Sequence, residues 1–136
     1  MSQKLNFGEF CWNELMTPDT KKAQAFYQDL FGWTSAKHDM GESTYTMFMQ
    51  GDKTIGGMLK TPEDKANIPP HWMSYISVAD LDATLDKVKK LGGTVIVPKT
   101  TAGDMGSFAI IQDPTGAPQD PTGAPIAIWK PSQKAM

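Results

Sequence analysis

The stretch Trp12–Trp33, with the sequence WNELMTPDTKKAQAFYQDLFGW, contains the pattern that decides the fold. The run over 10–17 at its start has strand character. A Thr-Pro-Asp triplet typical of helix starts follows, and apolar side chains then recur at spacings of three and four. This spacing predicts a helix over 19–31, and residues 33–37 return to strand character. The stretch therefore predicts a strand, a helix and a second strand in succession.

The second half of the chain repeats this order. A strand-like run over 71–78 precedes a predicted helix over 80–91, which ends before a Gly-Gly pair as helices often do. A strand candidate over 94–98 follows. A shift of 61 residues places Asp80 on Asp19 and also aligns a leucine and a glycine at the ends of the two helices. The two halves are therefore predicted to be related modules.

Each half continues with two further strand candidates, which gives each half the order strand, helix, strand, strand, strand. These candidates cover 44–50 and 53–60 in the first half and 107–112 and 126–130 in the second. A segment rich in proline and charge separates the halves, which is typical of an exposed linker. We therefore predict one α+β domain made of module one (7–60), a linker (61–70) and module two (71–131).

The composition is that of an ordinary folded domain rather than a disordered chain. The 136 residues are 40% hydrophobic, and the net charge of -2 comes from acids and bases that are interspersed along the chain. This pattern argues against nucleic acid or an anionic membrane as the main partner. A small molecule is the expected partner, and exposed strand edges leave room for a homodimer. Cys11 is the single cysteine and no secretion signal is visible, so we expect a cytoplasmic protein.

Three motifs, FYQDLFGW in the first half and LGG and DPTGA in the second, resemble those of the glyoxalase/bleomycin resistance/dioxygenase superfamily, also called vicinal oxygen chelate proteins. The resemblance covers nearly the whole chain and is strongest to bacterial glyoxalase-like proteins without an assigned reaction. It implies two βαβββ modules whose curved mixed sheets enclose a cleft. It also implies that metal-dependent relatives hold a divalent ion with side chains from the first and last strands of each module.

The resemblance puts the four ligand places of this sequence on Trp12 and Met73, near Met58, and on Ala127. Indole, thioether and methyl groups are poor donors for a hard or borderline divalent cation. We therefore predict that the protein holds no metal and uses no cofactor. The alternative is a lyase, isomerase or dioxygenase of the same superfamily whose divalent metal is held by non-standard ligands. Whether the chain is an enzyme stays open at this point.

Alternation along the first strand of each module separates two faces of the predicted sheets. Leu15 and Thr17, with their counterparts Ile76 and Val78, are expected to pack under the helices. The opposite face is expected to line the cleft, and along the two strands it carries Trp12, Glu14, Met16, Met73, Tyr75 and Ser77. This row contains only one ionisable side chain.

Glu14 is that ionisable side chain and the candidate catalytic residue. A carboxylate buried among apolar side chains is suited to act as a general base near neutral pH. The alternative is that Glu14 pairs with a lysine or bonds to Tyr75 and only shapes the cleft.

Methionine and aromatic side chains on the predicted strands are suited to line an adaptable pocket for a planar ligand, although they would equally form an ordinary core. The ligand-binding candidates are Trp12, Met16, Met47, Met58, Met73, Tyr75, Phe108 and Trp129. His38 and His71 are expected to be solvated or structural, and Cys11 to face a helix rather than act as a nucleophile. The predicted function is binding of a small apolar or aromatic molecule in the cleft between the modules.

A seven-residue segment, QDPTGAP, occurs twice in a row over 112–125. Asp-Pro-Thr-Gly favours a type I turn, and one such turn is enough to join the last two strands. Because seven is odd, an extra copy inside a strand would move every later side chain to the other face. We therefore predict that the extra copy loops out at the tip of a hairpin.

Overall fold

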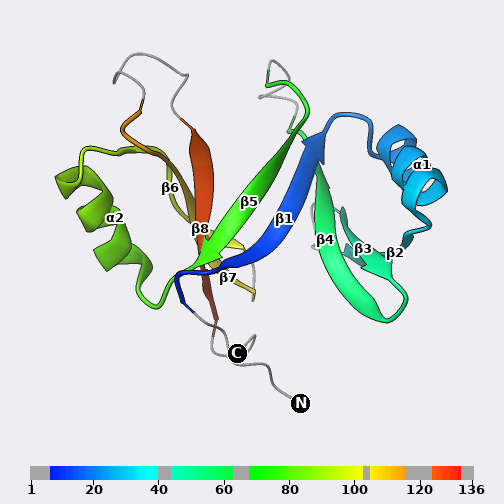
Figure 1. Ribbon diagram of the computed structural model, residues 1–136, viewed down its shortest axis with the longest axis horizontal. Coiled ribbons are helices and arrows are strands. Elements are labelled where there is room, and N and C mark those ends of the chain that lie inside the picture. The colour runs from blue at the N-terminus through cyan, green and yellow to red at the C-terminus, as the bar shows by residue number, and fades with distance from the viewer. Residues whose placement is uncertain (1–6, 40–43, 63–67, 103–104, 116–123, 133–136) are drawn as a thin grey trace. The chain divides into compact units, whose positions relative to one another are not determined.

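The computed structural model describes residues 7–39, 44–62, 68–102, 105–115 and 124–132. These residues form eight strands and two helices (Figure 1). Their order is β1 (Phe10–Thr17), α1 (Thr20–Phe31), β2 (Thr34–Asp39), β3 (Thr44–Gln50), β4 (Lys53–Lys60), β5 (His71–Ser77), α2 (Leu81–Lys90), β6 (Thr94–Ala102), β7 (Gly106–Gln112) and β8 (Pro125–Pro131). The predicted α+β class and the order of elements are confirmed, and β6 extends four residues beyond the predicted strand. Neither helix is long and apolar enough to cross a membrane.

The chain divides into two compact units, each of which holds one βαβββ set. The N-terminal unit is Trp12–Met73, and the C-terminal unit combines the residues up to Cys11 with those from Ser74 onward. The strand order of the first set is β2-β3-β4-β1, with β1 parallel to β4 and the other pairs antiparallel. The second set has the order β5-β8-β7-β6, with β5 parallel to β8. Each unit therefore has the same internal topology.

The core of the N-terminal unit lies between its sheet and α1. Leu15, Phe48 and Met58 are buried there, and Ala23 and Tyr27 of α1 pack against them. The helix starts where the Asp19 carboxylate accepts the backbone N–H of Lys22 at 3.0 Å. It ends at a glycine with a φ of 74°, a left-handed conformation that suits glycine. The structure thus places Leu15 on the helix side, as the alternation predicts.

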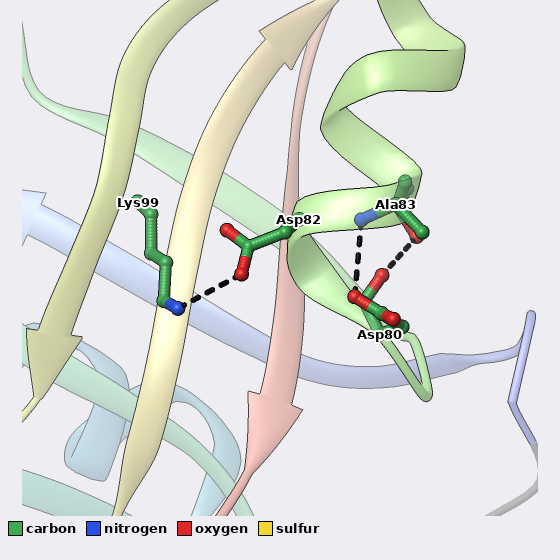
Figure 2. Close-up of polar contacts among 5 residues, drawn as sticks. Asp80, Asp82, Ala83 and Lys99 are labelled. Carbon is green, nitrogen blue, oxygen red and sulfur yellow. Dashed lines mark hydrogen bonds and ion pairs between the residues drawn. The ribbon is translucent and has the colours of Figure 1, made fainter.

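The C-terminal unit has a matching core under α2. Leu81, Ala109 and Ile128 are buried together. The Asp80 carboxylate accepts the backbone N–H of Ala83 at 3.0 Å and fixes the start of α2 (Figure 2). Nearby, Lys99 and Asp82 form a 3.2 Å ion pair between exposed side chains, which contributes little to stability (Figure 2).

The duplicated segment lies in the connection between β7 and β8. Gln112 at the end of β7 pairs with Pro125 at the start of β8, and the backbone N–H of Asp113 donates to the carbonyl of Ala124 at 3.2 Å. The hydroxyl and backbone N–H of Thr115 both donate to the Asp113 carboxylate, and these bonds lower its pKa. The copies therefore occupy a hairpin connection, although residues 116–123 lie outside the described part of the chain.

Deleting Gln119–Pro125 is expected to leave the fold intact, with equal or higher thermal stability. The deletion puts Pro118 in the place of Pro125 and leaves the five-residue loop Asp-Pro-Thr-Gly-Ala, a common hairpin length built on a type I turn. Halving a flexible loop lowers its closure cost by about 0.6 kcal/mol. Thermal unfolding followed by circular dichroism measures the change. A variant with the second copy replaced by glycine and serine is the length-matched control, and loss of cooperative unfolding in the deletion would contradict the loop assignment.

Candidate functional site

One face of the sheet in the N-terminal unit combines a carboxylate with apolar side chains. Alternation places Trp12, Glu14 and Met16 of β1 on the face away from the buried Leu15. In the register, Glu14 lies opposite Gly57 of β4, and Gly57 lies opposite Met47 of β3. Tyr45 lies two residues before Met47 on β3, so it is on the same face of the sheet as Met47 and Glu14. We call this surface the Glu14 face and define it by Trp12, Glu14, Met16, Tyr45, Met47 and Gly57.

Three side chains of the Glu14 face form a chain of hydrogen bonds. The indole N–H of Trp12 donates to the Tyr45 hydroxyl oxygen at 2.8 Å, and the Tyr45 hydroxyl donates to Oε2 of Glu14 at 2.7 Å. All three side chains are half-buried. Glu14, the candidate base predicted from the sequence, is thus hydrogen-bonded to a tyrosine on another strand. The hydroxyl of the same tyrosine also fixes the indole of Trp12.

Gly57 makes this arrangement sterically feasible. Tyr45 is on β3 and Glu14 is on β1, and β4 runs between those two strands. The Tyr45 ring therefore crosses over β4, where a Cβ added to Gly57 would lie only 2.6 Å from Cε2 of the ring. A residue with any side chain at this position would displace the tyrosine.

Sequence reasoning selected neither Tyr45 nor Gly57. A signal for both was present, since adjacent glycines inside a strand pattern often mark the close approach of another group. The aromatic residue that makes the approach has to come from a neighbouring strand on the same face, which requires the register as well as the alternation.

The structure places Met58 away from the predicted pocket. Met58 pairs with Leu15 and Thr46, and its side chain is 0% exposed in the core under α1. The expectation that it lines the ligand surface is therefore corrected, because paired residues share a face and Gly57 takes the position beside Glu14. Met16 and Met47 lie on the Glu14 face, and both are half-buried.

The aromatic candidates of the C-terminal unit share a face of their own sheet. Tyr75 is buried, and its ring lies 6.5 Å from those of Phe108 and Trp129 in edge-on geometry. Ala127 pairs with Tyr75 and is fully buried. Tyr75, Phe108 and Trp129 therefore form a compact aromatic group. Met73, the last residue of the N-terminal unit, is also buried.

The remaining reactive side chains lie at positions that suit structural roles. His38 is exposed and pairs with Tyr45 in the register, while Nδ1 of His71 lies 2.9 Å from the Pro69 carbonyl oxygen. Cys11 is half-buried, and burial raises the pKa of its thiol. A thiol that stays protonated at neutral pH is a weak nucleophile.

The residues at the ligand places that the resemblance implies do not fit a divalent metal. Those places are Trp12, Met73, Ala127 and a position near Met58, where the register puts Gly57 rather than Met58 opposite Glu14. None of these side chains supplies imidazole, carboxylate or thiolate, the donors that divalent cations require. Within the described ranges, no group of three or more His, Cys, Asp or Glu residues could hold an ion.

Two shallow depressions lie beside the helices rather than at the Glu14 face. One, of about 460 Å³, is next to α2 and is bordered by Phe7, Val78 and Asp80. The other, of about 350 Å³, is next to α1 and is bordered by Leu15, Phe26 and Tyr27. Neither is lined by the predicted ligand-binding residues.

Two βαβββ sets, each with its first strand parallel to its fourth, define the glyoxalase-like class of α+β folds. The chain belongs to the Glyoxalase/Bleomycin resistance protein/Dioxygenase superfamily, whose family model matches residues 10–126. This confirms the resemblance that the sequence motifs indicated.

The proteins to which this chain is similar have names that describe different activities. Over 109 residues the chain is 37% identical to "Putative glyoxylase CFP32" of Mycobacterium bovis, which covers 78% of this chain and 42% of that protein. Over 123 residues it is 31% identical to the anthracycline biosynthesis protein DauV of Streptomyces sp. strain C5, covering 81% and 45%. The chain thus spans less than half the length of these relatives. Methylmalonyl-CoA epimerase from Mycobacterium tuberculosis shares the fold, with a TM-score of 0.67, 14% identity, and coverage of 98% of this chain and 95% of that one.

Proposed function

We propose that the protein binds a small aromatic or apolar molecule at the Glu14 face and that this binding needs no metal ion. The observation that carries the proposal is the hydrogen-bonded chain Trp12, Tyr45 and Glu14 beside Met16 and Met47. A largely apolar surface with a few fixed polar groups is the usual composition of a small-molecule site.

The two kinds of side chain have different parts in the proposed binding. Trp12 supplies a large aromatic surface on which a planar ring can stack, and its hydrogen bond to Tyr45 fixes the indole before the ligand arrives. Met16 and Met47 are unbranched and adapt to the outline of a ligand. The Glu14 carboxylate is the polar group that orients the ligand. None of these contributions requires a coordinated cation.

The test compares Trp12→Ala with Trp72→Ala, using 2-naphthol as the probe and isothermal titration calorimetry as the measurement. Trp72 is the matched control because its indole N–H donates to the Tyr27 hydroxyl at 3.2 Å and its side chain is 41% exposed on the α1 side of the same unit. Loss of the stacking surface at Trp12 is expected to weaken binding about tenfold. The Trp72 variant should bind within about twofold of the parent protein.

The same titration is repeated after dialysis against EDTA, and the affinity should not change. Equal losses in the two tryptophan variants would place the binding surface elsewhere. Binding that disappears with EDTA and returns with a divalent cation would refute the metal-free proposal.

A further inference from the structure

The α1 helix leaves large apolar side chains on the surface of the N-terminal unit. None of its twelve residues, all of which the structure describes, is fully buried, whereas α2 buries Leu81 and Val88. Phe26 and Leu30 lie one turn apart on the same side of α1 and are 59% and 57% exposed. Large apolar side chains that adjoin one another on a surface are typical of an interaction site.

Charged side chains lie on either side of Phe26 along the helix. Lys22 lies four residues before Phe26 and Asp29 three residues after it, so all three share one side of α1. Both charged side chains are exposed, and among the described residues neither takes part in an ion pair. Seven residues of helix separate them by about 10 Å along the axis. This side of α1 thus has a positive charge near its start, an aromatic ring in its middle and a negative charge near its end.

We infer that this side of α1 binds the same side of α1 in a second copy of the chain. We call it the α1 face and define it by Lys22, Ala25, Phe26 and Asp29, all of them exposed. The pattern complements itself when the two helices run antiparallel. A two-fold axis between Ala25 and Phe26 brings Lys22 of each copy opposite Asp29 of the other, and the two Phe26 rings meet at the centre beside the small Ala25 side chains. This inference does not depend on the proposed function.

The charges favour this partner and this orientation over the alternatives. Parallel helices would place Lys22 beside Lys22 and Asp29 beside Asp29, and like charges across an interface repel each other. Antiparallel helices also bring the positive end of each helix dipole near the negative end of the other. A partner with one sign of charge, such as nucleic acid, would be attracted to one end of the α1 face and repelled from the other. The surface therefore fits a copy of itself.

Sedimentation velocity over a range of protein concentrations tests the inference, and the parent protein is expected to reach twice the mass of one chain. Phe26→Asp should stay monomeric over the same range, because it puts two like charges at the centre of the interface. Lys22→Glu and Asp29→Lys should each weaken dimerisation about tenfold. Each of them turns two attractive pairs into repulsive ones, since the two-fold axis repeats every contact.

A charge exchange and a matched control assign the effect to the α1 face. The double variant K22E/D29K restores opposite charges in both pairs and should dimerise within about threefold of the parent. Lys21→Glu makes the same change of charge at an exposed neighbour that points away from the α1 face, and it should dimerise within about twofold of the parent. The first turn of α1 has no acidic residue and its last turn no basic one, so the exchanged charges suit the helix dipole and should not prevent folding.

The outcomes are decisive in either direction. A parent protein that remains monomeric at every concentration would overturn the inference. A dimer that survives Phe26→Asp would place the contact on another surface, such as a strand edge, and a double variant no better than the single variants would exclude the antiparallel pairing. Thermal unfolding followed by circular dichroism checks that each variant is folded. If Phe26→Asp fails that check, the charge variants and the Lys21→Glu control still decide.

Discussion

Replacing Met58 with alanine is expected to destabilise the protein by about 3 kcal/mol, the usual cost of removing a buried methionine side chain from a packed core. Met58 is 0% exposed and packs with Leu15 and Phe48 under α1. Its loss leaves a cavity that the neighbouring strands cannot close without moving. For a chain of this length the midpoint of thermal unfolding should fall by about 10 °C, measured by circular dichroism.

Met47→Ala is the matched control, because Met47 is a half-buried methionine on the opposite face of the same sheet. It should cost less than about 1 kcal/mol of stability and weaken 2-naphthol binding severalfold. Met58→Ala should bind the probe normally at temperatures where it is folded. The reverse pattern would mean that Met58 lies on the ligand surface, as the sequence suggested, and that the register around Gly57 is wrong.

The amphipathic patterns of the chain were sufficient to predict the elements and most of the faces. α1 and α2 each present apolar side chains at helical spacing, and the strand residue that packs beneath α1, Leu15, follows from simple alternation. The seven-residue repeat could also be placed, because an odd insertion is not compatible with a paired strand. Both inferences rest on repeating patterns that can be read directly from the amino-acid sequence.

The face of the sheet on which the Met58 side chain lies could not be predicted in this way. The pairing of β3 with β4 shifts between Phe48 and Met49, where Gly56 pairs with Phe48 but Thr54 pairs with Met49. A bulge of this kind inserts one residue and changes which side chains share a face, and the sequence does not reveal where it occurs. A difference of one residue is enough to exchange the faces of Met58 and Gly57.

The hydrogen-bond chain could not be predicted for a different reason. Tyr45 and Glu14 are 31 positions apart in the sequence and lie on strands that are not neighbours. Their contact depends on the length of the tyrosine side chain and on the missing side chain at Gly57. Neither property produces a periodic signal, and only the adjacent glycines marked the position.

Gly57→Ala is therefore expected to disrupt the binding site with little loss of stability. A Cβ at this position overlaps the Tyr45 ring, whose end can swing away, so the backbone need not shift. The displaced tyrosine loses its bonds to Trp12 and Glu14, and the indole is no longer fixed for stacking. We expect 2-naphthol affinity to fall about tenfold in calorimetric titrations, with an unfolding midpoint within a few degrees of the parent.

Gly56→Ala provides the comparison at the adjacent position. A Cβ there would lie 3.0 Å from the backbone oxygen of Asn13, and it is on the other face from Tyr45. Backbone cannot move away as a side-chain end can, so this variant should lose stability while the folded protein keeps its affinity for the probe. Adding Gly57→Ala to a Tyr45→Phe background should have less effect than adding it to the parent, because the two bonds that it breaks are already absent. Full affinity in Gly57→Ala would show that the tyrosine bridge contributes nothing to binding and that the ligand surface lies elsewhere.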